Sequence, residues 1–131
     1  MALVEAGVLV LDCTEPEKLA AFYKELLDGE QTDVTVDQVG IRGAEGTRMA
    51  FRRDVNAPPP TWPRPENSLQ VHLEFVVEDL DEAERRIIGL GGRPLETRDG
   101  PGPFAERGYA DPAGHSFTLR RPPTTAEGGP F

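Results

Sequence analysis

The fold of this chain is decided by GVLVLDCTEPEKLAAFYKELL (residues 7–27) and its second copy QVHLEFVVEDLDEAERRIIGL (residues 70–90). Each stretch begins as an apolar, strand-like run and continues as an amphipathic helix. Apolar helix positions recur 64 residues apart (83 − 19, 87 − 23 and 90 − 26), in the pairs Leu19 and Ala83, Tyr23 and Ile87, and Leu26 and Leu90. A unit this small cannot bury its own apolar face. The sequence therefore predicts two copies that pack on each other, with a cleft where they meet.

The first unit is predicted to be a strand, a helix and three further strands. Residues 7–11 are apolar at every position after the glycine, which is typical of a central strand covered on both faces. Thr14 and Glu17 have the spacing of a capping box, and Pro16 falls in the first helical turn, where its missing N–H costs little. Gly29 is the expected C-cap. Short strands are predicted near residues 32–36, 39–41 and 47–52.

The second unit repeats this order after a proline-rich segment at residues 54–69, which predicts an extended crossover. A strand is expected at residues 70–77. Asp79 with Glu82 can cap the following helix, and Gly91-Gly92 ends it near Leu90. Three more strands are expected near residues 93–97, 104–110 and 115–121. The sequence thus predicts one α+β domain over residues 1–121, with βαβββ modules at residues 5–53 and 70–121 and a flexible tail at residues 122–131.

Composition and charge narrow the classes of partner. At 131 residues the chain is long enough for one domain with a core of its own. The formal net charge of −9 argues against nucleic acid and against an anionic membrane surface, because both are bound mainly through Lys and Arg. Cys13 is the only cysteine, so no internal disulfide can form. No signal-peptide pattern or membrane-spanning apolar run is present, and a cytoplasmic protein is expected.

Four motifs, in this order along the chain, resemble one superfamily. They are Phe22-Tyr23 with Leu26-Leu27, Trp62-Pro63, His72-Leu73-Glu74-Phe75 leading to Asp79-Leu80-Asp81, and Asp111-Pro112-Ala113-Gly114-His115. In this order and spacing the chain resembles the vicinal oxygen chelate superfamily of glyoxalase I, bleomycin-resistance proteins and extradiol dioxygenases, and in particular its glyoxalase-like branch. The resemblance covers about residues 5–121. It implies two βαβββ modules forming a curved mixed β-sheet around a cleft, and a homodimer. One departure is Asp28, which stands where the family usually has a glycine after the first helix.

The resemblance also implies four metal-binding positions, on the first and last strand of each module. Carried over to this chain they are Val8, Ala50, His72 and Thr118, of which only His72 is a competent ligand. A catalytic metal generally needs at least three suitable protein donors. The expected cofactor is therefore none. The alternative is one divalent metal held by His72, Glu74 and Asp12, because side chains two apart on a strand share a face.

Several residues are candidates for ligand contact, and each has a plainer structural reading. His72 can donate or accept a proton near neutral pH, or be a relic held by a neighbouring carboxylate. Glu74 can act as an acid or base, or form an ion pair with Arg48, Arg52 or Arg120. Trp62 can stack on a ligand as a lid, or only pin the crossover to the sheet.

Arg48 can hold an anionic group or be a solvated residue at a strand end. Thr118 and Ser116 offer hydroxyl groups to the cleft. Cys13 is expected to fill the core, and His115 is expected in a turn or on the opposite face from Thr118.

The preferred functional hypothesis is a metal-independent small-molecule-binding protein of glyoxalase and bleomycin-resistance type, which sequesters a drug or toxic metabolite. Its ligand-binding residues would be His72, Glu74, Trp62, Arg48, Asp12 and Thr118. The alternative is a glyoxalase-like lyase or isomerase, metal-dependent or not, in which His72 and Glu74 carry out acid–base chemistry. A third reading is a regulatory or structural protein with a vestigial cleft.

Overall fold

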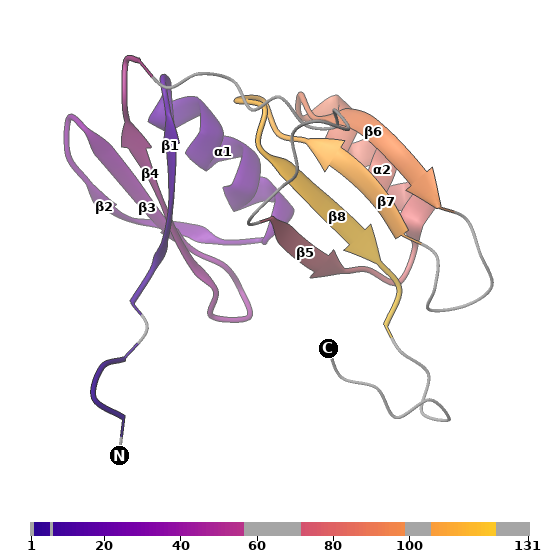
Figure 1. Ribbon diagram of the computed structural model, residues 1–131, viewed down its shortest axis with the longest axis horizontal. Coiled ribbons are helices and arrows are strands. Elements are labelled where there is room, and N and C mark those ends of the chain that lie inside the picture. Colours follow the sequence, from indigo (N-terminus) through magenta and orange to yellow (C-terminus); the bar gives the residue numbers. More distant parts are fainter. Residues whose placement is uncertain (1, 6, 57–71, 99–105, 123–131) are drawn as a thin grey trace. The chain divides into compact units, whose positions relative to one another are not determined.

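The computed structural model describes residues 2–5, 7–56, 72–98 and 106–122, and of residues 96–98 the backbone only. The predicted crossover beyond residue 56, Trp62 and the predicted tail from residue 123 lie outside the described residues. The chain divides into two compact units, Met1–Pro58 and Pro59–Phe131. Each unit holds four strands and one helix (Figure 1). Among the described residues, neither helix is long and apolar enough to cross a membrane.

The first unit is one four-stranded mixed sheet with a helix inserted after its first strand. Its elements are β1 (Leu9–Cys13), α1 (Pro16–Leu26), β2 (Glu30–Val34), β3 (Gln38–Arg42) and β4 (Arg48–Arg53). The strand order is β1-β4-β3-β2. β1 is parallel to β4, and the other neighbours are antiparallel.

The second unit has the same topology. Its elements are β5 (Leu73–Val76), α2 (Leu80–Gly89), β6 (Arg93–Arg98), β7 (Glu106–Ala110) and β8 (Ser116–Arg120), with strand order β5-β8-β7-β6. Even the irregularities recur, because the β2–β3 and β6–β7 ladders each contain a register shift. The α+β fold with two βαβββ modules, predicted from the repeated pattern, is confirmed.

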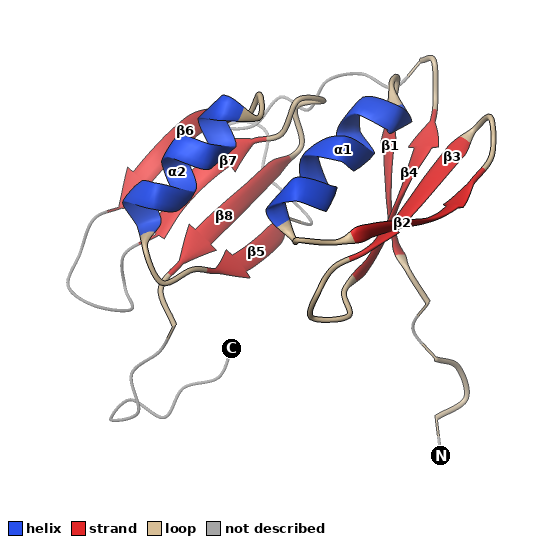
Figure 2. Ribbon diagram, turned by 180° about the vertical axis from the view of Figure 1, so that it is seen from behind, coloured by secondary structure: helices blue, strands red, loops and turns tan. Residues whose placement is uncertain are grey.

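Each helix covers one face of the sheet in its own unit (Figure 2). In the first unit Leu19, Phe22 and Tyr23 of α1 are buried against β3 and β4, and the ring of Tyr23 stacks on Phe51 with centroids 5.5 Å apart. In the second unit Ile87 of α2 is fully buried. Because strand side chains alternate, the opposite face of each sheet carries a separate set of residues.

The ends of α1 differ from the prediction. No side chain caps its N-terminus: the N-cap residue is Glu15, and Glu17 instead forms an ion pair with Arg53. The predicted capping box is wrong because α1 begins one residue later than it requires, so that Glu15 and not Thr14 is the N-cap, and because Glu17 has a charged partner. At the other end the C-cap is Leu27, and the left-handed position is taken by Asp28 (φ 48°).

Gly29 is therefore not the C-cap, and its small size serves another purpose. The N–H of Gly29 bonds the carbonyl of Lys24 at 2.9 Å, which completes the turn after α1. A Cβ on Gly29 would lie 2.5 Å from the carbonyl oxygen of Arg42 on β3. Asp28 thus occupies the backbone conformation in which the family usually places glycine, and Gly29 allows the chain to pass close to β3.

The prediction that residues 7–11 form a central, covered strand is also wrong. β1 is the outermost strand of its sheet, and Val8 and Val10 keep 49% and 41% of their surface exposed. An unbroken apolar run indicates burial only when a second sheet partner and a second layer are present.

The ends of α2 follow the prediction. Asp79 accepts the N–H of Glu82 at 3.1 Å, and Gly91 has a positive φ of 104° just after the helix.

A charged network joins α2 to β7. The hydroxyl of the fully buried Tyr109 donates to Glu84 Oε1 at 2.7 Å. Arg107 lies 3.0 Å from Asp81 and 3.7 Å from Glu84. Burial, and then the hydrogen bond and negative charge of Glu84, raise the pKa of Tyr109 well above its ordinary value.

This raised pKa predicts a loss of stability in alkali. Below the ordinary tyrosine pKa of about 10 the phenol is neutral in both states, so its contribution is fully present. Above about pH 10 the unfolded chain loses the proton while the folded protein keeps it, and the free energy of unfolding falls as pH rises. Urea unfolding at increasing pH should show this fall in the wild type and a shallower one in Tyr109→Phe. Equal slopes would contradict the assignment.

Candidate functional site

In the first unit, a cavity of about 500 Å³ lies on the face of the sheet that turns away from α1. The alternation along β4 explains its composition: Met49 and Phe51 are buried on the helix side, whereas Arg48 and Ala50 belong to the other face. Ala50 faces Gly40 across the β3–β4 ladder, so neither residue brings a large side chain to the floor of the cavity at this point. The lining residues are Gly7, Val8, Thr32, Asp33, Thr35, Gln38, Gly40, Ile41, Arg42, Arg48, Met49 and Ala50.

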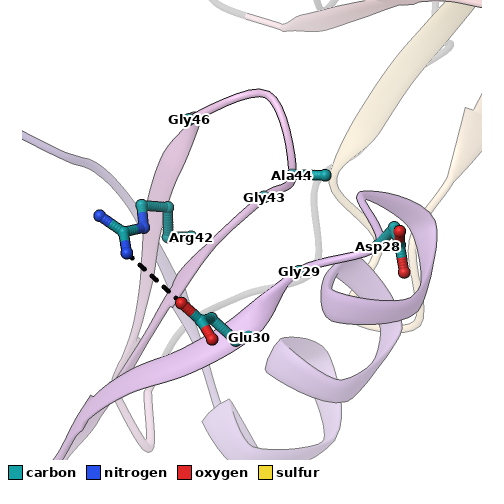
Figure 3. A pocket seen from close by; sticks show the side chains of 7 residues that line it. All are labelled: Asp28, Gly29, Glu30, Arg42, Gly43, Ala44 and Gly46. Atoms are coloured by element: carbon teal, nitrogen blue, oxygen red, sulfur yellow. Dashed lines mark hydrogen bonds and ion pairs between the residues drawn. The ribbon is translucent and has the colours of Figure 1, made fainter.

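A second, more open hollow of about 460 Å³ lies where the end of α1 meets the β3–β4 turn. Figure 3 shows Arg42 and Glu30 pointing toward each other on one side of it, with Nη2 and Oε1 3.3 Å apart, while Asp28 points away from them. Most of the remaining lining is backbone, from Gly29, Gly43 and Gly46. Its acidic side chains are Glu30, which is paired with Arg42, and Asp28, which points away from that pair. Arg42 borders both cavities.

In the second unit, the corresponding face of the sheet carries an acid–base pair. His72 Nε2 lies 3.3 Å from Glu74 Oε2, and Arg120 Nη1 lies 3.6 Å from Glu74 Oε1. Thr118 stands opposite Glu74 in the β5–β8 ladder. The buried hydroxyl oxygens of Thr118 and Ser116 have no hydrogen-bond partner among the described residues. This face therefore combines a carboxylate, an imidazole and two buried hydroxyl groups whose hydrogen-bonding capacity is unused among the described residues.

Comparison with known proteins then identifies the family. The sequence model of the glyoxalase-like domain matches residues 8–120, which span both units. The chain belongs to the glyoxalase-like domain family. No curated protein sequence matches it.

Solved structures confirm the fold of this glyoxalase-like protein. The fosfomycin resistance protein FosX from Listeria monocytogenes is 17% identical with a TM-score of 0.72, covering 95% of this chain and 98% of that one. A glyoxalase/bleomycin resistance protein/dioxygenase family enzyme from Burkholderia phytofirmans is 11% identical with a TM-score of 0.68, covering 87% and 95%. A glyoxylase/bleomycin resistance protein/dioxygenase domain from Frankia is 19% identical with a TM-score of 0.67, covering 92% and 98%. The predicted resemblance to the vicinal oxygen chelate superfamily is confirmed.

The residues at the four metal-binding positions that the resemblance implies are a poor set of donors for a metal ion. Val8 and Ala50, the positions of the first unit, both line its cavity and offer no donor atom. Of the second pair, His72 is a good ligand and the Thr118 hydroxyl a poor one. Among the described residues, no three His, Cys, Asp or Glu side chains are arranged to hold a metal ion.

The predicted alternative donor, Asp12, is already engaged. Its two carboxylate oxygens accept from Arg52 Nε at 2.9 Å and from Arg52 Nη2 at 3.0 Å. The hydrogen bond and charge of Asp12 raise the pKa of Arg52, so the guanidinium keeps its positive charge. A metal would have to displace a bidentate guanidinium to gain this carboxylate.

The other predicted residues of the glyoxalase-like protein fall into separate groups. Arg48 lines the cavity of the first unit, whereas His72, Glu74 and Thr118 lie together in the second unit. Glu74 pairs with Arg120, one of its three predicted partners, while Arg52 binds Asp12.

The predictions for Cys13, in the core, and for His115, in a turn, are confirmed. Cys13 is buried. His115 precedes β8 and contacts Asp111, with Nδ1 and Oδ2 3.0 Å apart.

The sequence analysis missed Thr32, Asp33 and Gln38, which line the cavity. A signal for Gln38 was present, because Gln38, Gly40 and Arg42 alternate with the buried Val39 and Ile41 along β3. No comparable signal marks Thr32 and Asp33, since every residue of β2 is exposed and the β2–β3 ladder is irregular there.

Proposed function

We propose that this glyoxalase-like protein binds a small molecule without the help of a metal ion. One observation carries the proposal: the cavity of the first unit contains Val8 and Ala50 at two of the superfamily's metal positions. Its volume of about 500 Å³ lies within the usual range of small-molecule sites. An apolar floor with a few polar groups at the edge is the usual composition of such a site.

Sequestration fits this chemistry, because it needs affinity and no reaction. A protein that only withdraws a drug or toxic metabolite from solution gains nothing from a catalytic metal. Several structures that share the fold are named as fosfomycin or bleomycin resistance proteins, which supports a drug-like small molecule as the ligand. Two of the FosX structures are Mn(II) complexes, so the proposal of binding without a metal rests on this chain's own residues. In the second unit His72, Glu74 and Thr118 lie on one face of the sheet, and their contact with a ligand stays a prediction. A cytoplasmic homodimer, which the resemblance and the lone cysteine suggest, stays a prediction.

Thermal-shift screening against metabolites and antibiotics, with and without EDTA, tests the proposal. A bound ligand raises the unfolding midpoint according to its concentration and dissociation constant. We expect at least one compound to raise the midpoint by the same amount in both buffers. A compound that acts only when a divalent ion is present would contradict metal-independent binding.

A lyase or isomerase is the second candidate, and the contact between His72 and Glu74 favours it. With Glu74 held by Arg120, the carboxylate can orient the imidazole, and one of the two groups can remove a proton next to a carbonyl. The free hydroxyl of Thr118, opposite Glu74, can then donate to the oxygen that becomes negative.

Recovery of the bound compound separates the two candidates. Each compound that stabilises the protein is incubated with the wild type, His72→Ala and Glu74→Gln, and is then analysed by NMR. Unchanged compound in all three samples supports the binding protein. Conversion by the wild type that is lost in both variants would establish the enzyme instead.

A further inference from the structure

We infer that the ligand of the first unit's cavity carries one anionic group, a carboxylate or phosphonate, which Arg48 binds. This inference rests on the proposed function and names the ligand class of the same site. It follows from the distribution of charge over the sheet of the first unit, from the position of Arg48 in the cavity, and from the chemistry of the guanidinium group.

Arg48 differs from the other described arginines of the first unit. Arg42 pairs with Glu30, Arg52 with Asp12, and Arg53 with Glu17. Arg48 forms no ion pair with any residue that the structure describes, and its side chain lines the cavity. Among the described arginines of this unit, it is thus the one that a ligand can engage without breaking an existing pair.

The sheet register sharpens this argument. Glu30 of β2 faces Arg42 of β3, and Arg42 faces Arg48 of β4. Like charges directly opposite each other are destabilising, and of these two adjacent cations only Arg42 has a carboxylate partner among the described residues. A negative group next to Arg48 would complete an alternating row of charge. On the other side of Arg48, β1 pairs with β4 from Leu9 and Met49 onward, and the residue before Leu9 is the apolar Val8, which also lines the cavity. None of the acidic residues that the structure describes forms an ion pair with Arg48 there.

Asp33 also lines the cavity, but it does not neutralise Arg48. Asp33 lies on β2 and Arg48 on β4, with β3 between them. Neighbouring strands are about 4.8 Å apart, so these two positions are roughly 10 Å apart across the sheet. The anionic group of the ligand is therefore expected at the Arg48 end, with an apolar body over Val8 and Ala50. A planar guanidinium with several donors can bind a carboxylate or phosphonate through two parallel hydrogen bonds.

Matched aromatic probes test this inference. Phenylacetate and phenylphosphonate carry the anionic group, and phenylacetamide has a similar shape without charge. Dissociation constants are measured by calorimetry and by ligand-observed NMR for the wild type, Arg48→Ala and Arg48→Lys. Lys18→Ala serves as the control. It removes one positive charge from an exposed position of α1, the helix on the other side of the same sheet.

Arg48→Ala is expected to weaken both anionic probes by roughly 10- to 100-fold, the range for a lost charge-assisted hydrogen bond. Arg48→Lys should restore part of this loss, because an ammonium keeps the charge but not the paired donors. Phenylacetamide should bind all variants alike, and Lys18→Ala should behave as the wild type does.

Two results would overturn the inference, and they can be told apart. If Arg48→Ala and Lys18→Ala weaken the anionic probes equally, the probes respond only to the net charge of the protein, and the inference about Arg48 is wrong. The proposed function would still stand in that case if phenylacetamide or a screened compound binds the wild type. If no probe and no screened compound binds the wild type, both the inference and the proposed function are wrong.

Discussion

Replacing Val8 with tryptophan is expected to weaken the binding of every ligand in the first unit's cavity by about tenfold or more, because the indole ring would occupy space that the ligand needs and a steric conflict of this kind costs about 1–3 kcal/mol. Val8 lines the cavity and is half exposed, so a larger ring can extend into the cavity without disturbing the buried residues under α1. Calorimetric titration with the compounds found by thermal-shift screening measures the effect.

Val10→Trp is the matched control. Val10 lies two residues further along the same strand, is similarly exposed, and does not line the cavity. Binding by Val10→Trp should therefore stay close to that of the wild type. If both tryptophan variants bind as the wild type does, the cavity of the first unit is not the ligand site.

Asp111→Ala is expected to lower the free energy of unfolding by roughly 2–4 kcal/mol, because it leaves buried donors without an acceptor. The carboxylate of Asp111 is 1% exposed. It accepts the backbone N–H groups of Ala113 and His115 at 2.9 and 3.0 Å, and it contacts the His115 ring. These bonds organise the turn that joins β7 to β8, and thus the strand that carries Thr118 and Arg120.

Urea unfolding followed by circular dichroism measures this loss. Asp111→Asn provides the control, because its amide oxygen can still accept the two N–H groups and only the charge is removed. We expect a smaller loss for this variant than for Asp111→Ala. An Asp111→Ala protein within about 0.5 kcal/mol of the wild type would show that the turn does not depend on this carboxylate.

The repeated sequence pattern predicted the fold well because the apolar residues kept their helical spacing in both copies. Apolar residues at helical spacing marked α1 and α2, and Asp79 and Gly91 marked the ends of the second helix. The coverage of β1 could not be predicted, since an apolar run does not say how many neighbours a strand has. The capping box at Thr14 failed because the partner of Glu17, Arg53, is 36 residues away in the sequence.

The site was predicted only in part, because local sequence patterns show which face of a strand a residue occupies but not which strand lies beside it. Strand alternation correctly placed His72 beside Glu74 and turned Arg48 and Ala50 to one face of β4. The pairing of Asp12 with Arg52 depends on the register between β1 and β4, which local patterns do not fix. Thr32 and Asp33 line the cavity at a register shift in the β2–β3 ladder, and such a shift leaves no pattern in the sequence.

Metal content tests the central claim most directly. Purified protein is incubated with Mn²⁺, Ni²⁺, Zn²⁺ or Fe²⁺ and desalted, and the bound metal per chain is measured for the wild type and for His72→Ala. Because Val8 and Ala50 cannot act as ligands and Asp12 is bound to Arg52, we expect no stoichiometric ion in either protein. One tightly held ion per chain in the wild type that is lost in His72→Ala would contradict a metal-independent site.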